Sequence, residues 1–210
     1  TSFTNSLLIT TVSTILTIML SAMTAFVIVR NKWKACGILF SLMIASMVIP
    51  FQVLMIPLVS LYGGIFGVLN SRITLILMHV GFSLSMATFM FHGAIHTSIP
   101  LELEEAALID GVTRGQMIRK IILPLIMPAI TICLFMTTTN AFKMFDLNLA
   151  LTAGLPGKST SLVALDIYNS FYNRMGYEGV GQAKAVMFLL IVATISVTQL
   201  IITRRKEVEN

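Results

Sequence analysis

The side chains most able to do chemistry in this sequence are concentrated in one charged segment, residues 97–123, between two apolar stretches. Acids come first and bases follow, in the order Glu102, Glu104, Glu105, Asp110, Arg114, Arg119 and Lys120. Carboxylates displayed on a short helix can pair with basic residues on the rim of a groove in another protein. The chemistry to expect from this segment is therefore recognition of a partner.

Two short helices are predicted to position these charges. Pro100 suits a first helical turn, Ser98 can cap it, and the acids lie near its positive N-terminal end, which together predict a helix over 101–109. Gly111 should end this helix. The segment is expected to form a helix-turn-helix in the cytosol.

The second short helix is expected over 113–123, with Pro124 resetting the backbone at the membrane edge. The first helix has a small apolar side, made of Leu103, Ala106, Ala107 and Ile109. A partner protein would cover that side by receiving the helix in a groove. The alternative is a helix resting on the bilayer surface. The acids disfavour it, because anionic headgroups prefer Lys and Arg.

A second polar set, Asn140, Lys143 and Asp146, recurs at a spacing of three near the outer end of the apolar segment 124–142. This spacing keeps the three side chains roughly on one helical face. Sugar hydroxyls need both donors and acceptors, and an amide, an ammonium and a carboxylate supply them, so the set is a candidate substrate path. In a second interpretation, Lys143 and Asp146 pair with each other at the interface while the substrate binds mainly on a partner subunit.

No metal or nucleotide site is predicted in this chain. His92 and His96 stand four apart, a spacing at which two imidazoles can share a metal, but no carboxylate or cysteine lies nearby on the same helix. His79 is expected to be a hydrogen-bonded packing residue. The glycine-rich turn at 62–67 lacks the lysine and hydroxyl of a P-loop, so any ATP must be hydrolysed elsewhere.

The composition is that of a membrane protein. Of the 210 residues, 56% are hydrophobic and 11% are charged, whereas a soluble domain carries about 25% charged residues. The net charge of +5 comes from short basic clusters beside apolar stretches, which is the pattern that sets membrane topology. Most soluble enzymes are excluded, and nucleic acid is not an expected partner.

Apolar segments long enough to cross a bilayer, which takes about 20 residues, lie at about 6–29, 36–61, 73–95, 124–142 and 185–203. Basic clusters alternate with the other connections, and they comprise Arg30, Lys32 and Lys34, then Arg114, Arg119 and Lys120, then Arg204, Arg205 and Lys206. Placing all the clusters inside puts the N-terminus of the chain outside and its C-terminus in the cytoplasm. An N-terminus outside the cell needs an upstream segment to carry it across the membrane, most simply one more transmembrane helix, which would make six spans.

The fold class predicted is an all-α, polytopic transmembrane bundle in a single domain over 1–210, with an external loop at 143–184 before the last span. The first span carries hydroxyl residues on one face, which is expected to pack against protein and to return its hydrogen bonds to the backbone: Thr10, Thr14, Thr17, Ser21 and Thr24. Pro50 and Pro57 predict a kinked or interrupted second span.

The charged segment also contains residues at the offsets E-A-A-x3-G-x9-I-x-L-P, namely Glu105, Ala106, Ala107, Gly111, Ile121, Leu123 and Pro124. It thereby resembles the EAA loop of ABC import permeases. The stretch 99–128, including Asp110 before the glycine, resembles the carbohydrate-uptake, maltose-type branch. Residues 5–7 are similar to the start of that family's core, 47–58 to the third span of its second permease subunit, and 142–160 to its first subunit.

This resemblance implies a type I ABC importer permease in the bacterial cell membrane, surrounded by lipid and without a nucleotide site of its own. A second, related permease subunit would complete the path, two ATPase subunits would bind ATP and Mg at the cytosolic faces, and an extracellular binding protein would deliver a sugar or oligosaccharide. Residues 97–123 would then be the coupling loop. Another small polar solute is the alternative cargo.

Two other classes of function fit the residues less well. An intramembrane enzyme or assembly factor without an ATPase would need His-Glu-x-x-His, Gly-x-Ser-x-Gly or paired intramembrane aspartates, which the sequence lacks. An ion-coupled carrier would need buried carboxylates in its spans. Asp146 and Asp166 are instead expected near or beyond the outer membrane edge.

Overall fold

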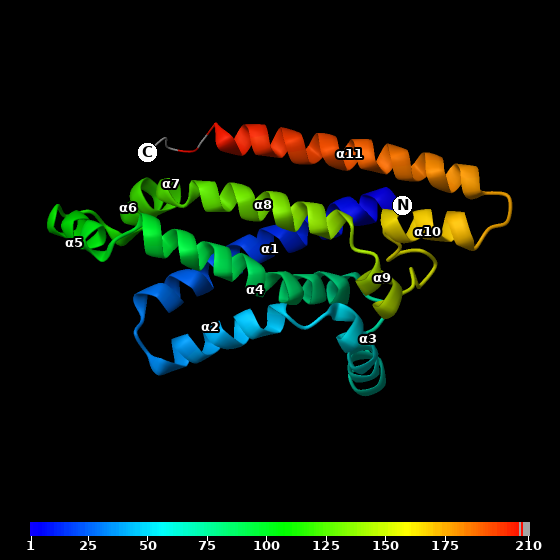
Figure 1. Cartoon of the computed structure of the whole chain (residues 1–210), viewed down its shortest axis with the longest axis horizontal. Coiled ribbons are helices and arrows are strands. Elements are labelled where there is room, and N and C mark those ends of the chain that lie inside the picture. The colour runs from blue at the N-terminus through cyan, green and yellow to red at the C-terminus, as the bar shows by residue number, and fades with distance from the viewer. Residues whose placement is uncertain (206, 208–210) are drawn as a thin grey trace.

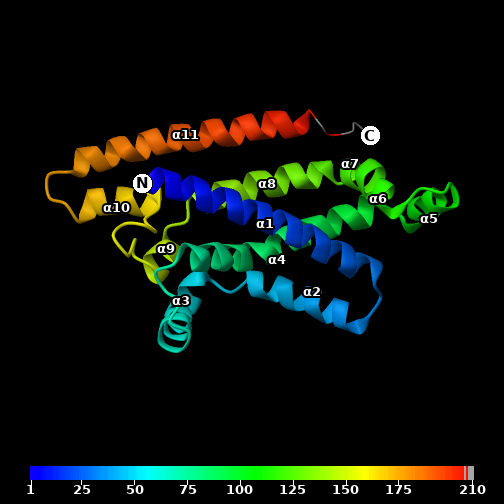
Figure 2. The same ribbon diagram turned by 180° about the vertical axis from the view of Figure 1, so that it is seen from behind.

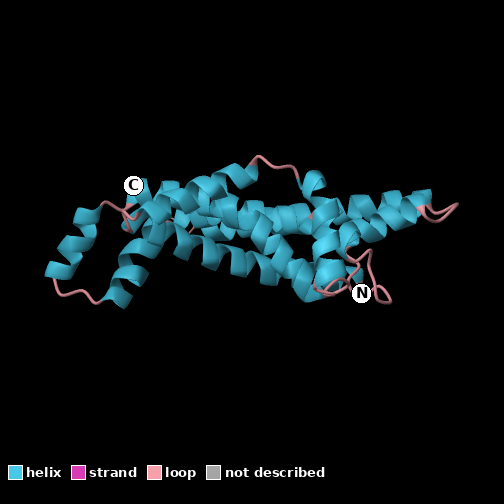
Figure 3. Cartoon of the chain, turned by 90° about the horizontal axis from the view of Figure 1, so that it is seen from below, coloured by secondary structure: helices cyan, strands magenta, loops and turns pink. Residues whose placement is uncertain are grey.

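The computed structural model describes residues 1–205 and 207. Figure 3 shows helices joined by loops, and no strand occurs among the described residues, which confirms the all-α fold class. Two of the helical elements, η1 and η2, are π-helices. In chain order the elements are α1 (Ser2–Arg30), α2 (Lys34–Met47), α3 (Phe51–Val59), η1 (Ser60–Ile65), α4 (Arg72–Ser98), α5 (Leu101–Ile109), α6 (Arg114–Met117), η2 (Ile118–Ile122), α7 (Leu123–Leu125), α8 (Met127–Phe142), α9 (Asp146–Leu151), α10 (Val163–Tyr172) and α11 (Glu178–Arg204).

Three of these helices, α1, α4 and α11, are long and apolar enough to cross a membrane by themselves. Two further candidates are bent pairs: α2 with 51–65, at an angle of 101°, and 114–125 with α8, at an angle of 68°. Counting each bent pair as one span gives up to five spans in the described part of the chain. The apolar segments of the sequence therefore correspond to helices, although two of them are not straight.

The second predicted span is interrupted at one of its two prolines. α2 ends at Met47, and Pro50 is the N-cap of α3. Proline has no N–H to donate and disfavours helical geometry in the residue before it, so the break falls there. Pro57 lies inside α3 without ending it, and the helix continues into η1. The predicted interruption is confirmed at Pro50 alone.

The centre of the bundle is formed by α1, α4 and α8, which lie side by side in Figures 1 and 2. A cluster of buried apolar residues joins them to the segment between α4 and α8, and its members are Ala25, Ala87, Phe91, Ile95, Ile99, Ala107, Met117, Ile122, Ile126, Ala129 and Cys133. α11 packs on α8 and α10 and leaves most of its surface exposed. The charged segment thus shares one core with the central helices.

The hydroxyl face of α1 is buried, as predicted, with Thr10, Thr14, Thr17 and Ser21 all inaccessible and Thr24 half-buried. Ser21 returns its hydroxyl to the backbone by donating to the Ile18 carbonyl at 3.2 Å. The hydroxyls of Thr10, Thr14 and Thr17 have no hydrogen-bond partner among the described residues, so the prediction of backbone bonding is wrong for them. The face serves close packing, because small side chains let helices approach.

The two ends of the bundle differ in what they carry. Figures 1 and 2 place α5, α6, the α1–α2 connection and the end of α11 together at one end, and α9, α10 and the N-terminus at the other. The basic clusters around Arg30, Arg114 and Arg204 therefore share one end, as the topology argument requires. Lys206 and Asn210 lie outside the described residues.

The predicted external loop, 143–184, is a folded segment that contains α9, α10 and the first turns of α11. Buried Asn148 organises it: the amide nitrogen donates to the Thr152 hydroxyl at 2.8 Å and the Thr160 carbonyl at 2.9 Å, and the amide oxygen accepts from Leu162 N at 3.1 Å. Asn5 of α1 donates to the Ser161 carbonyl at 3.1 Å. The segment 143–184 is thereby fastened to the start of α1.

Candidate functional site

The first helix of the charged segment, α5, spans Leu101–Ile109, the range predicted from the sequence. Its N-cap is Pro100, and no side-chain hydrogen bond caps it. The prediction that Ser98 caps this helix is wrong, because Ser98 is the last residue of α4 and Ile99 is the C-cap of α4. α5 therefore follows α4 after a link of two residues, which restricts how far the two helices can move independently.

The end of α5 explains the spacing between Ala107 and Gly111. Val112 N donates to the Ala107 carbonyl at 3.0 Å, and Gly111 N donates to the Leu108 carbonyl at 3.1 Å. This pair of bonds is a Schellman motif, which requires a left-handed residue at the first position beyond the C-cap. Gly111 occupies that position with φ +77°, and Val112 packs against the cluster that contains Ala107. The prediction that Gly111 ends the helix is confirmed.

The second helix begins with a capping box and is bent later than predicted. The Thr113 hydroxyl accepts from Gln116 N at 3.4 Å, while the Gln116 side chain accepts from Thr113 N at 3.0 Å. The helix then runs through η2 into α7, so Pro124 lies inside a helix and does not reset the backbone. The turn falls at Ile126, because Pro128 lacks an N–H and suits the first turn of α8.

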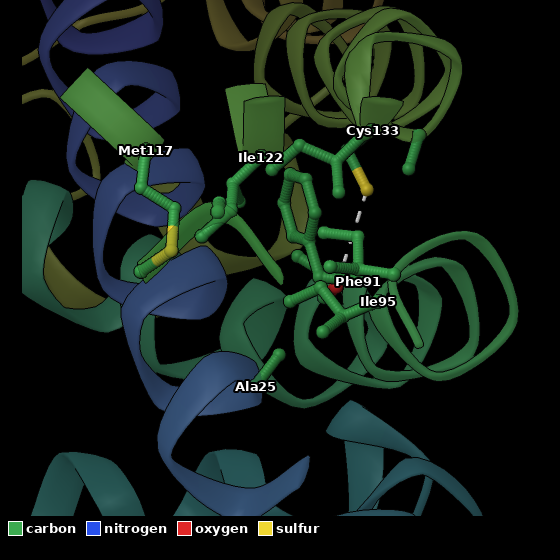
Figure 4. Close-up of a cluster of buried hydrophobic side chains, with 11 residues drawn as sticks. Ala25, Phe91, Ile95, Met117, Ile122 and Cys133 are labelled. Carbon is green, nitrogen blue, oxygen red and sulfur yellow. Dashed lines mark hydrogen bonds between the residues drawn. The ribbon is translucent and has the colours of Figure 1, made fainter. Parts of the chain in front are cut away.

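The side chains of the signature divide between the protein interior and solvent. Ala107 is buried, and Ile121 is partly buried against the same cluster. Figure 4 shows Ile122 of this segment beside Phe91 of α4, and Met117 belongs to the same buried cluster. Exposed members include Glu105, Ala106, Asp110, Gly111 and Leu123, and Pro124 is intermediate. The prediction that a partner covers Ala107 is wrong, because the chain's own core covers it.

The surface of α5 that faces away from this core is acidic and apolar. Glu105 is exposed, and exposed apolar side chains of α5 include Leu103, Leu108 and Ile109, of which Ile109 is 86% exposed. α5 projects from the end of the bundle in Figure 1, where another protein can reach it. A rigid helix with an exposed acid and exposed apolar side chains is suited to a groove with a basic rim.

Sequence reasoning missed the ion pair between Arg30, the last residue of α1, and Glu104 of α5. Arg30 Nε donates to Glu104 Oε1 at 2.8 Å, and Arg30 Nη2 donates to the Ile99 carbonyl at 2.8 Å. Both charged side chains are largely buried. A separation of 74 residues hides this pair from any local pattern. The sequence offered only two signals for this pair. Arg30 ends an apolar segment, and the adjacent Glu104 and Glu105 point in different directions on a helix.

The three candidate path residues are separated in the structure. α8 ends at Phe142, and Asp146 begins α9. The prediction that Asn140 and Asp146 share one continuous helical face is therefore wrong. Asn140 lines a hollow of about 200 Å³ between α4 and α8, together with His79 and Ser83. The Asp146 carboxylate accepts weakly from Gln52 Nε2 at 3.5 Å, and no Lys143–Asp146 ion pair occurs among the described residues.

Lys143 lies on another side of α8. It lines a mainly apolar hollow of about 570 Å³ between α8, α10 and α11. A single substrate in the Asn140 hollow would therefore not touch Lys143 in this conformation. Of the predicted set, Asn140 is the residue that lines the hollow between α4 and α8, where its exposed amide can meet a polar solute.

The histidines that could suggest metal chemistry are engaged in packing. The ring centroids of His92 and His96 are 6.2 Å apart, and His92 stacks on Phe40 at 4.0 Å. No group of three or more potential metal ligands gathers among the described residues. His79 is buried, and its Nε2 lies 3.4 Å from the Ser83 hydroxyl. The burial and the Ser83 contact of His79 agree with its expected role as a hydrogen-bonded packing residue.

A helical bundle able to span a membrane, with a helical loop projecting from one end, is the architecture of a polytopic membrane protein. The chain belongs to the family described as the binding-protein-dependent transport system inner membrane component, whose model matches residues 10–208. The match covers the central helices, the charged segment and the segment 143–184.

Individual relatives agree with this family. The chain is 49% identical over 112 residues to the probable starch degradation products transport system permease protein AmyD of Thermoanaerobacterium thermosulfurigenes, an alignment that covers 53% of the chain and 38% of AmyD. It is 29% identical over 201 residues to the multiple sugar-binding transport system permease protein MsmG of Streptococcus mutans, covering 95% of the chain and 70% of MsmG.

A second relative from Thermoanaerobacterium thermosulfurigenes, the probable permease protein AmyC, is 40% identical over 127 residues, covering 60% of the chain and 45% of AmyC. The matched part of the chain thus spans less than half the length of both AmyD and AmyC. Among solved structures, a bacterial ABC transporter involved in the import of alginate matches with a TM-score of 0.79 and 19% identity, over 97% of this chain and 78% of the other. This likeness establishes the permease fold.

Proposed function

We propose that the chain is the transmembrane permease subunit of an ABC importer that moves a sugar or oligosaccharide into the cell. Membership in a binding-protein-dependent family supports import, and the names of AmyD and MsmG support a carbohydrate cargo. ATP and Mg are bound and ATP is hydrolysed by a separate ATPase subunit. The chain contributes the path and the mechanical connection to that subunit.

The observation that carries this proposal is the construction of the charged segment. A Schellman turn at Gly111 and a capping box at Thr113 fix the angle between α5 and α6. Burial of Ala107 and Met117 fastens both helices to α1, α4 and α8, while Glu105 stays exposed. A segment that is rigid, fastened on one side and free on the other is suited to carry displacement from a docked partner into the bundle.

The proposed mechanism needs only this geometry. Closure of the ATPase subunits on ATP displaces α5 as a rigid body, and its contacts with the buried cluster transmit the displacement to α4 and α8. The bend at Ile126 lets 114–125 and α8 change their mutual angle. ATP-bound and nucleotide-free ATPases must contact α5 differently, since a partner with equal affinity for both states would shift nothing.

The substrate path is proposed to pass Asn140. Its amide can both donate to and accept from sugar hydroxyls, and Ser83 and His79 line the same hollow between α4 and α8. Phe82 adds an apolar ring to this lining. Lys143 and Asp146 belong to the proposed path at its outer end, on separate surfaces, where each can meet hydrated solute.

The proposed assembly contains this chain, a second and related permease subunit, two ATPase subunits and an extracellular sugar-binding protein, with lipid around the bundle. The end that carries the basic clusters is placed in the cytoplasm, because cytoplasmic connections are rich in Lys and Arg. In this orientation the N-terminus of the chain faces outside and the C-terminus faces the cytoplasm of a bacterial cell.

Replacing Glu105 with Lys tests this proposal. The expected result is normal abundance in the membrane with loss of substrate-stimulated ATP hydrolysis in the purified complex, because the exposed acid would meet the basic rim as a like charge. Glu178→Lys is the matched control, since Glu178 is an exposed acid at the first residue of a helix at the opposite end. Unchanged stimulation in Glu105→Lys would contradict a role of α5 in coupling.

A further inference from the structure

Two adjacent glutamates of α5 face in opposite directions. Successive residues of an α-helix point about 100° apart, so neighbours rarely share an environment. Glu105 is exposed, whereas Glu104 retains 8% of its accessible surface. Glu104 is therefore turned toward its own chain and is not available to a partner docked on the outer face of α5.

Glu104 is held there by Arg30. The guanidinium donates from both Nε and Nη2 to Oε1 of Glu104, and Nη2 also donates to the Ile99 carbonyl at 2.8 Å. The side chains of Arg30 and Glu104 are 16% and 11% exposed. The guanidinium also lies over the Phe26 ring, 5.6 Å from its centroid. One side chain of α1 thus holds both the link between α4 and α5 and the first turn of α5.

The local electrostatics reinforce this arrangement. Arg30 lies in the last turn of α1, the negative end of that helix, and it meets a carbonyl at the C-terminal end of α4. Glu104 lies in the first turn of α5, the positive end of its helix. Removing either charge would leave the other largely buried without a partner, which is strongly unfavourable. The contact is consequently expected to persist when α5 moves.

We infer that Arg30 is a positioning residue that makes α1 move with the coupling loop. This inference rests on the proposed function, because it assigns a route to the displacement that the ATPase imposes on α5. The covalent route runs from α5 into α4 on one side and through α6 into α8 on the other. The Arg30–Glu104 pair adds α1, which packs more extensively on α4 than on any other described element.

The experiment measures solute transported per ATP hydrolysed by the complete importer in proteoliposomes. Arg30→Gln and Glu104→Gln are expected to lower this ratio about 2- to 30-fold, the range over which residues that transmit coupling change it. Substrate-independent ATP hydrolysis and co-purification of the ATPase should remain, because the outer face of α5 is intact. Asp166→Asn is the control, since it disrupts the other described ion pair, Asp166–Lys184 at 2.7 Å, at the opposite end of the bundle.

Two further variants separate positioning from simple loss of folding. Arg30→Lys keeps the charge but has no planar fork for the Glu104 carboxylate and the Ile99 carbonyl together, so an intermediate ratio is expected. The double exchange Arg30→Glu with Glu104→Arg should recover part of the ratio lost in the single variants.

The inference would be overturned if Arg30→Gln and Glu104→Gln both transported as much solute per ATP as the parent. It would also be overturned if the double exchange recovered none of this ratio although all proteins reached the membrane equally. An equal decrease in Asp166→Asn would overturn it too. The proposed function fails by a different result, which is a parental complex that shows no ATP-dependent transport of any sugar.

Discussion

Replacing Gly111 tests whether the turn between α5 and α6 depends on backbone conformation or on space. Gly111 has φ +77°, and a Cβ placed there would meet nothing within 4 Å. A left-handed conformation costs an L-residue roughly 1–2 kcal/mol, and that cost does not depend on the size of an unobstructed side chain. The turn therefore depends on the backbone conformation of Gly111 and not on the space around it. Gly111→Ala and Gly111→Leu should behave alike.

The expected magnitude follows from that strain. A loss of one to two kcal/mol increases the population of the opened turn about 5- to 30-fold. The amides of Gly111 and Val112 donate the bonds of the turn, so their hydrogen exchange should accelerate by this factor in both variants. Exchange is measured by mass spectrometry on the purified protein, with peptides that cover 107–112. Transport per ATP should decrease in the same variants, because the angle between α5 and α6 is no longer fixed.

Gly115→Ala provides the matched control in the same segment. A Cβ at Gly115 also meets nothing within 4 Å, but this residue lies inside α6 and its φ is not in the left-handed range. Exchange at 107–112 should be unchanged in this variant, since alanine favours a helix over glycine. Parental exchange in Gly111→Ala, or a much larger effect of leucine than of alanine, would refute the reasoning from backbone strain.

Three other predictions concern the path, the orientation and the segment 143–184. Asn140→Ala should raise the transport KM or lower the maximal rate at unchanged abundance, whereas Lys143→Ala should change transport less because Lys143 lines a different hollow. Transport kinetics equal to the parent's in both variants would show that the substrate path does not use these residues. A cysteine at Gly64, in a protein without its natural cysteines, should react in intact cells with a membrane-impermeant thiol reagent, and labelling only after lysis would reverse the proposed orientation. Asn148→Ala should lower the free energy of unfolding by about 2–4 kcal/mol, because three buried hydrogen bonds are lost, and a denaturation midpoint equal to the parent's would contradict this role.

The parts of the fold that depend on local chemistry could be predicted from the sequence. The bounds of α5 follow from Pro100, the acids and Gly111, and the break of the second span follows from Pro50. These features are decided within one or two turns of the chain, where propensity and capping act. The spacing between Ala107 and Gly111 is likewise the spacing of one Schellman turn.

The parts that depend on contacts between distant residues could not be predicted. An amphipathic pattern does not say whether the chain or a partner covers Ala107, and Arg30 and Glu104 meet only after α1 and α5 have been placed. The prediction that Asn140, Lys143 and Asp146 share one face assumed a helix that continues past Phe142. The sequence has neither glycine nor proline there to indicate that the helix ends. Met144 and Leu147 are instead buried in a second apolar cluster with Ile9, Leu75, Leu151 and Leu162, and this tertiary packing favours the end of α8 there.

The measurement that tests the central claim most directly is site-specific cross-linking from the outer face of α5. Ile109 is 86% exposed and lies beside the Schellman turn, so a photoreactive residue at this position should not disturb the fold. The account predicts that Ile109 cross-links to an ATPase subunit in membranes, and that ATP changes the yield. A cross-linker at exposed Met175, beyond α10 at the opposite end, should give no such product. Capture of lipid alone at Ile109, with no ATPase subunit in any nucleotide state, would contradict the account.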